Sequence, residues 1–139
     1  MNRPTNEVLG RLAFLANTRG IIPDPIDATR ITKSASQSGA GTNVFYTVPA
    51  GKVLFIDSAW LGGRETADAD SYFSLASRDT GDAFYLAFLT LGFTKAGQHS
   101  LSNQYIPALE FPAGYDVYLE SGHANIKADA GFSGWLEGV

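Results

Sequence analysis

The sequence predicts an all-β protein: an antiparallel β-sandwich, in the form of an eight-stranded jelly roll, with an N-terminal arm that contains one short helix. Three observations predict it. Short β-rich runs alternate with turn residues from Val44 onward, almost no helical periodicity lies between them, and the 139 residues include 15 glycines and 12% aromatic residues. An immunoglobulin-like sandwich is the alternative, although the cysteine pair typical of that fold is absent.

The expected arm covers residues 1–43, and its one convincing helix covers residues 5–19. Apolar residues recur there at helical spacing, and Gly20 follows where helices often stop. The apolar stripe consists of Val8, Leu9, Leu12 and Leu15. A helix this short is marginal alone, so we expect the stripe to anchor the arm to a surface.

An extended linker is expected after this helix. Pro23 and Pro25 rule out a regular helix or a central strand. Residues 34–42 form a Ser/Gly/Ala run without apolar anchors, which predicts a mobile loop. The β-sandwich body is therefore expected to cover residues 44–139.

Turn residues divide the rest of the chain into strands. The strands are expected near residues 29–34, 44–48, 53–62, 71–77, 83–93, 100–109, 115–121 and 132–138.

One segment of the body occurs twice. The residues from Val48 to Ser58 align without gaps on those from Phe111 to Ser121: an apolar residue, a Pro-Ala-Gly turn, an alternating strand, an acid and a serine. Proline presets the turn, and glycine tolerates the positive φ that such turns need. The repeat has two interpretations, namely two hairpins that use the same good turn, or the pseudo-symmetry of a double Greek key.

The alternation of side chains in the repeat predicts which residues face the core. Leu54 and Ile56 are expected to point inward, whereas Phe55 and its counterpart Tyr118 are expected to point outward.

Charge is low and uneven. Only 17% of the residues are charged, which suggests that part of the surface is covered by partners. Residues 1–43 carry five bases against three acids (+2), and residues 44–139 carry five bases against eleven acids (−6). The asymmetry is either chance or a tether that docks on an acidic surface. A pI near 5 argues against a nucleic-acid partner, and no run approaches a membrane span.

Catalytic and metal-binding signatures are missing, so we expect no enzyme activity and no cofactor. No cysteine is present, and His99 and His123 lack a second ligand at metal-binding spacing and are expected at loop edges. Glu65, Asp68 and Asp70 form an acidic cluster that we interpret as a solvated turn, because the calcium-loop pattern is absent. A small jelly-roll enzyme would need a pocket where a histidine meets carboxylates.

Adjacent aromatic residues recur in the body, and on a strand the two members of such a pair point to opposite faces. Some aromatic side chains must therefore lie outside the core, as ordinary half-exposed residues, in an interface, or as a platform for sugars. The candidates for an interface or for ligand stacking are Phe55, Tyr72, Tyr85 and Tyr118.

Three motifs together resemble a known group of proteins. These are Tyr-Thr-Val-Pro-Ala-Gly-Lys at residues 46–52, Phe-Pro-Ala-Gly-Tyr-Asp-Val at 111–117 and Gly-Phe-Ser-Gly-Trp-Leu-Glu-Gly at 131–138. The region from Phe45 to Val139 resembles small β-sandwich (jelly-roll) virion proteins of tailed phages, such as head decoration (cement) proteins and fibre or spike proteins. Residues 1–43 are not part of the resemblance.

The resemblance implies a non-enzymatic structural virion protein. Its expected role is to decorate and stabilise a capsid from the exterior, after synthesis in the host cytoplasm. The expected partners are the chain itself, as a homotrimer, and the major capsid protein or another virion protein, with no nucleic acid and no membrane. The alternative is a carbohydrate- or receptor-binding module of a phage fibre, spike or tail.

Overall fold

The computed structural model describes residues 28–139. The predicted helix over residues 5–19, with Val8, Leu9, Leu12 and Leu15, lies outside the described residues. The described part contains eight β-strands. They are β1 (Thr29–Ser38), β2 (Gly41–Thr47), β3 (Lys52–Glu65), β4 (Ser71–Arg78), β5 (Phe84–Phe93), β6 (Gly97–Phe111), β7 (Asp116–Ser121) and β8 (Ile126–Gly138).

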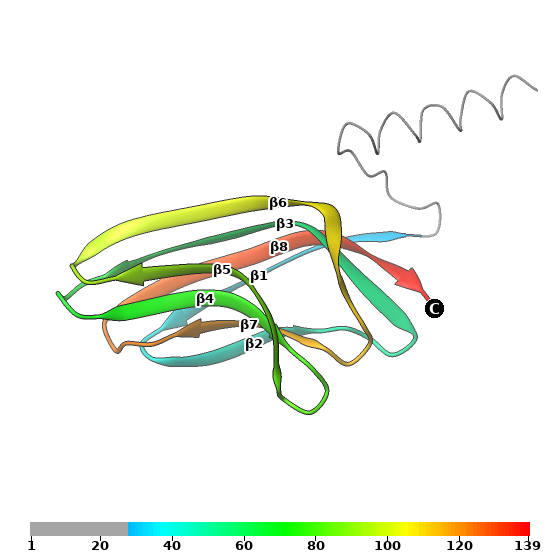
Figure 1. Ribbon diagram of the computed structural model, residues 1–139, viewed down its shortest axis with the longest axis horizontal. Helices are drawn as coiled ribbons and strands as arrows, with labels where there is room; N and C mark the ends of the chain where they lie inside the picture. Colours follow the sequence, from blue (N-terminus) through cyan, green and yellow to red (C-terminus); the bar gives the residue numbers. More distant parts are fainter. Residues whose placement is uncertain (1–27) are drawn as a thin grey trace, which may run out of the picture.

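The strands form two antiparallel sheets that pack face to face (Figure 1). The first sheet has the order β1-β8-β3-β6 and the second the order β2-β7-β4-β5. The chain changes sheet at every connection except the one from β4 to β5. This is the winding of an eight-stranded jelly roll, so the predicted fold class is confirmed.

The mobile loop expected over residues 34–42 is wrong. β1 continues to Ser38, and β2 begins at Gly41. Every residue of β1 pairs with β8, from Thr29 opposite Leu136 to Ser38 opposite Lys127. The small polar side chains of this edge strand mostly face solvent, so backbone pairing rather than apolar anchoring holds it. The sandwich therefore begins at Thr29, well before the boundary expected after residue 43.

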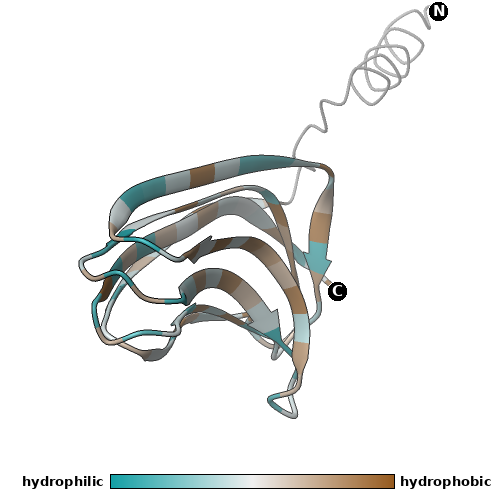
Figure 2. Cartoon of the chain, turned by 60° about the vertical axis from the view of Figure 1, so that its left-hand side comes forward, coloured by the Kyte–Doolittle hydropathy of each residue, from teal (hydrophilic) through white to brown (hydrophobic). Residues whose placement is uncertain are grey.

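The core lies between the two sheets and is rich in phenylalanine. Its largest fully buried side chains include Phe73, Phe111 and Phe132. Leu54 and Ile56 are also fully buried, as the alternation in the repeated segment predicts. Figure 2 shows apolar colours along most of the strands, and the hydrophilic colour in the loops and on parts of β6.

A β-bulge in β3 reverses the alternation of its side chains. The register shifts between Ile56 and Ser58 in the pairing with both β6 and β8. As a result Ile56, Ala59 and Leu61 all face the core, and Trp60 faces outward from the first sheet. The bulge therefore decides which side chains of β3 reach the surface.

The two Pro-Ala-Gly turns lie side by side at one end of the sandwich. Gly51 and Gly114 both have positive φ, of 73° and 84°. The amide of Gly114 donates to the carbonyl of Val48 (2.8 Å), and the amide of Val48 donates to the carbonyl of Tyr115 (2.9 Å). Each turn carries the chain from one sheet to the other, so neither is a hairpin. This favours the pseudo-symmetry of a double Greek key over two unrelated hairpins.

Candidate interaction surfaces

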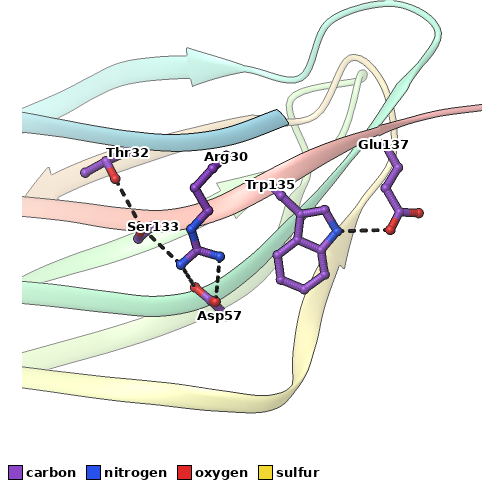
Figure 3. A network of polar contacts seen from close by, with 6 residues as sticks. All are labelled: Arg30, Thr32, Asp57, Ser133, Trp135 and Glu137. Carbon is purple, nitrogen blue, oxygen red and sulfur yellow. Dashed lines mark hydrogen bonds and ion pairs between the residues drawn. The ribbon is translucent and has the colours of Figure 1, made fainter. Parts of the chain in front are cut away.

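Phe55 points outward as predicted, but it packs within the chain. It stacks on Trp135, its cross-strand partner in β8, with ring centroids 5.3 Å apart and planes 13° apart. Trp135 is only 3% exposed, and its Nε1 donates to Glu137 (3.0 Å; Figure 3). Phe55 therefore covers a tryptophan on the outer face of the first sheet, and it is not free to stack on a ligand.

An ion pair beside this stack joins two strands that do not pair directly. Arg30 of β1 donates to both carboxylate oxygens of Asp57 in β3, at 2.8 and 3.0 Å, across β8 (Figure 3). The hydroxyl of Ser133 in β8 lies within hydrogen-bond distance of both Arg30 and Thr32. This bidentate pair fastens the edge strand to the centre of the sheet.

Tyr72 and Tyr118 lie on the outer face of the second sheet, near Glu120. Tyr118 points away from the core, as predicted, yet it is only 9% exposed. Burial raises the pKa of both phenols, and the neighbouring carboxylate of Glu120 raises it further. Tyr72 is the more exposed of the two, so it alone of this pair offers a ring to a partner.

Tyr85 lies on β5, near the connections at the end with the Pro-Ala-Gly turns. Its ring packs edge-on against Tyr115 (4.9 Å) and Phe111 (5.8 Å). The four predicted aromatic residues therefore do not converge: Phe55 lies on the first sheet, Tyr72 and Tyr118 on the second, and Tyr85 on an edge strand. No shared stacking platform arises from them.

The edges of β5 and β6 form an almost uncharged side of the molecule. Within the described residues, β5 pairs only with β4, and β6 pairs only with β3. The two edge strands lie on the same side, where Tyr105 of β6 donates to the carbonyl of Phe88 in β5 (3.0 Å). Between Asp82 and Glu110, Lys95 is the only Lys, Arg, Asp or Glu.

Large apolar side chains are exposed on these same two strands. Phe84 is 66% exposed and Ile106 is 57% exposed, and Tyr85 and Leu101 are also exposed. We call these four residues with their two strands the β5–β6 edge. Edge strands present unpaired N–H and C=O groups, and proteins usually protect such strands with charges. An unprotected apolar edge is typical of an interaction surface.

The outer face of the first sheet holds two depressions, and Trp60 lines both. One depression, of about 730 Å³, is lined by Trp60, Arg64, Gln98, Ser100, Lys127 and Asp129, among others. The second, of about 490 Å³, lies beside Trp60 and is lined by Ser58, Ser102, Asn103 and Gln104. The sequence did not predict this site, because simple alternation from Leu54 and Ile56 would point Trp60 inward.

The two histidines lie in different surroundings. His99 packs its ring against Phe93 (4.8 Å). His123 does meet a carboxylate: its Nδ1 lies 3.5 Å from Oε2 of Glu65. Glu65 is only 2% exposed, so its place in a solvated turn is wrong, whereas Asp68 is exposed and pairs with Lys95. The Glu65 carboxylate is buried beneath the connection from β7 to β8, away from both depressions.

Residues 28–139 contain no cluster of three or more His, Asp or Glu side chains that could hold a metal ion. In the same residues no helix is long and apolar enough to cross a membrane.

Comparison with known proteins gives matches in fold alone. No known protein family and no curated protein matches the sequence. Among solved structures, the capsid of Helicobacter pylori bacteriophage KHP30 is 14% identical (TM-score 0.46, covering 81% of this chain and 98% of that chain). The capsid of cyanophage Pam1 is 11% identical (TM-score 0.43, 81% and 89%). The Eiger TNF of S. frugiperda is 9% identical (TM-score 0.44, 80% and 93%).

Proposed function

We propose that the chain is a non-enzymatic structural protein of a virus particle, which decorates the exterior of a capsid and stabilises it as a homo-oligomer. The observation that carries the proposal is the β5–β6 edge, where two open strands expose Phe84, Tyr85, Leu101 and Ile106 with almost no charge. A stable monomer would be expected to protect such a surface.

The occupant of this edge, on our proposal, is a second copy of the chain. Strand edges are satisfied by other strand edges, and β1 and β2 leave a second open side on the far flank of the sandwich. Pairing of one side with the other is a head-to-tail contact, which closes into a ring when the rotation per subunit fits. A trimer is the ring that we propose.

The segment before the sandwich is proposed to attach this ring to the capsid protein. The support is in the sequence: residues 1–27 carry three bases, Arg3, Arg11 and Arg19, against three acids, and the apolar stripe of Val8, Leu9, Leu12 and Leu15. Residues 1–27 therefore have no net charge, and residues 28–139 carry the whole net charge of −4. Burial of the apolar stripe, rather than attraction between charges, would then provide most of the binding energy.

The proposal is tested by co-purification with virus particles from cells that carry the gene. The wild-type chain is expected at a fixed stoichiometry, and Leu12→Asp is expected to reduce its occupancy strongly. Ala124→Asp, at an exposed position in the connection between the inner strands β7 and β8, is a matched control for an added charge outside both open sides of the sandwich. A wild-type chain that is absent from particles would rule out the virion role.

The second candidate is a carbohydrate- or receptor-binding module of a fibre, spike or tail. The predicted platform of Tyr72, Tyr85 and Tyr118 does not support it, because these rings lie apart. One other observation favours it: Trp60 is exposed between two polar depressions.

A further inference from the structure

We propose that the outer face of the first sheet binds an acidic saccharide, with Trp60 as the stacking platform and with Arg64 and Lys127 as the site for the carboxylate. The inference does not depend on the assembly role. None of the four exposed side chains of the β5–β6 edge lines the two depressions beside Trp60.

The indole of Trp60 packs against the backbone of β8 and is still partly exposed, as a stacking platform requires. It projects from the centre of the sheet next to Gly131 of β8, where an added Cβ would lie 2.1 Å from Cζ2 of the indole. The indole therefore rests on the backbone of β8, yet the residue is still 37% exposed. A rigid, exposed indole suits the apolar C–H face of a pyranose ring, which it can contact over many atoms.

The hollows beside Trp60 have the size and polarity of a sugar site. Their volumes, about 730 and 490 Å³, fall in the range of small-molecule sites. Gly62 and several serines line the depressions with small side chains, which leaves room for a ligand. Gln98 and Gln104 add amide donors and acceptors along β6. A di- or trisaccharide could thus place one ring on each side of the indole.

A pair of cations marks one end of the larger hollow. Arg64 of β3 and Lys127 of β8 are direct cross-strand partners on the outer face. Like charges directly opposite each other destabilise a sheet. Within residues 28–139, neither Arg64 nor Lys127 forms an ion pair that would offset this repulsion. Asp129, the carboxylate of the lining, accepts a hydrogen bond from Ser36. The lining therefore carries one excess positive charge.

A ligand carboxylate would relieve this repulsion. Arg64 can bind a carboxylate with two parallel hydrogen bonds, and Lys127 adds a point charge. The one excess positive charge of the lining favours a sugar with one carboxylate, and the single indole favours one stacked ring. A sialic acid or a uronic acid meets both conditions. Single-stranded nucleic acid would also stack on Trp60, but it needs a basic groove along the whole strand. Here the basic residues that line the depressions are Arg64, Lys127 and His99, all in the larger one, on a chain of net charge −4.

The test is a titration followed by the NMR signals of the two indole N–H groups in the full-length chain. The two tryptophans give one signal each. Sialyllactose and trigalacturonic acid are the acidic probes, and lactose is the neutral control. We expect a saturable shift of the Trp60 signal with at least one acidic probe below about 10 mM. The signal of Trp135, which is buried, should not move and reports that the protein remains folded.

Three variants separate the parts of the site. Trp60→Ala removes the reporting indole, so its binding is measured by saturation-transfer NMR on the ligand, where it should be weaker on the order of tenfold or more. Arg64→Gln should abolish the preference for acidic over neutral sugar. Gly62→Val should block binding by filling the hollow, since an added Cβ would lie 3.6 Å from Ser100, an ordinary contact. Lys52→Gln, outside both depressions, is the control for the loss of one positive charge and should bind like the wild type.

Three results would overturn the inference. One is the absence of a saturable Trp60 shift with either acidic probe. Another is binding of lactose as tight as that of sialyllactose and unaffected by Arg64→Gln. The third is a larger Trp60 shift with an oligothymidylate than with both acidic sugars, which would assign the platform to nucleic acid. None of these results bears on co-purification with particles.

Discussion

The backbone amide of Gly114 donates a 2.8 Å hydrogen bond to the carbonyl oxygen of Val48, and this bond joins the two Pro-Ala-Gly turns of the sandwich. The turns are 63 residues apart in the sequence, measured from Gly51 to Gly114. Each turn also closes on itself, through Lys52 to Pro49 and through Tyr115 to Pro112. The repeated segment is thus a structural repeat that carries the chain between sheets.

The two turn glycines should differ in their tolerance of alanine. Both have positive φ, which costs a residue with a Cβ about 1–2 kcal/mol. At Gly51 an added Cβ meets nothing within 4 Å, whereas at Gly114 it would lie 2.7 Å from Cγ2 of Thr80. Urea unfolding should therefore show a larger loss of stability for Gly114→Ala than for Gly51→Ala. Thr80→Ser should recover part of the loss only in the Gly114→Ala background.

Phe55 and Phe84 both point away from the core, but their truncation to alanine should cost very different amounts of stability. Phe55→Ala removes the ring that stacks on Trp135 and should cost about 2–3 kcal/mol, somewhat below the cost at fully buried sites. Phe84→Ala should change the unfolding free energy by less than about 0.5 kcal/mol, because the residue is largely exposed. Denaturant unfolding at low protein concentration measures both. Equal costs would mean that Phe84 packs within the subunit.

The buried carboxylate of Glu65 makes the chain sensitive to His123. Oε1 accepts from the amide of Ala67, but Oε2 has no hydrogen bond and lies 3.5 Å from the imidazole. His123→Ala should destabilise the fold by about 1–3 kcal/mol, because it leaves the carboxylate without an ionisable partner. Adding Glu65→Gln should then recover part of the loss. A purely additive double-mutant cycle would show that the two side chains do not interact.

Alkaline conditions should weaken the fold through four tyrosines. Burial raises the pKa of Tyr46, Tyr72, Tyr105 and Tyr118. A group whose pKa is higher in the folded state contributes stability that is present below its unfolded pKa, about 10, and that is lost as the pH rises through the folded pKa. The unfolding free energy should therefore fall above pH 10, while tyrosinate absorbance lags behind that of the unfolded chain.

Glu120 supplies the control for this pH dependence. Its charge raises the pKa of Tyr72 and Tyr118 in addition to burial. Glu120→Gln should lower the pKa of these two phenols, as seen in the spectrophotometric titration, and leave Tyr46 and Tyr105 unchanged. A titration curve identical to that of the wild type would contradict the assigned neighbours.

The strands could be predicted from sequence because most of them carry clear signals. Turn residues bracket the runs, and alternation in the repeat placed Leu54 and Ile56 in the core. The end of β1 was missed because its serines have no apolar signal, and backbone pairing to β8 is visible only in three dimensions. Trp60 was missed because the bulge after Ile56 reverses the faces of β3.

The candidate surfaces were predicted only in outline. The low charge predicted a surface that partners cover, and this stays a prediction. The sequence could not show that β5 and β6 are neighbouring edges of different sheets. Phe55 was chosen as a candidate because it faces outward, and its stacking on Trp135 depends on a cross-strand register that the sequence does not reveal. Arg64 and Lys127 lie 63 positions apart, and only the pairing of β3 with β8 brings them together.

The mass of the full-length chain in solution tests the central claim, self-association through the β5–β6 edge, most directly. Sedimentation or light scattering at high protein concentration should give a multiple of 14.8 kDa, three by our proposal, for the wild type and for the Ala124→Asp control. The double variant Phe84→Asp, Ile106→Asp should be a folded monomer, because it puts charge on the two most exposed side chains of the edge. A monomeric wild type, or a double variant that keeps the wild-type mass, would contradict the account.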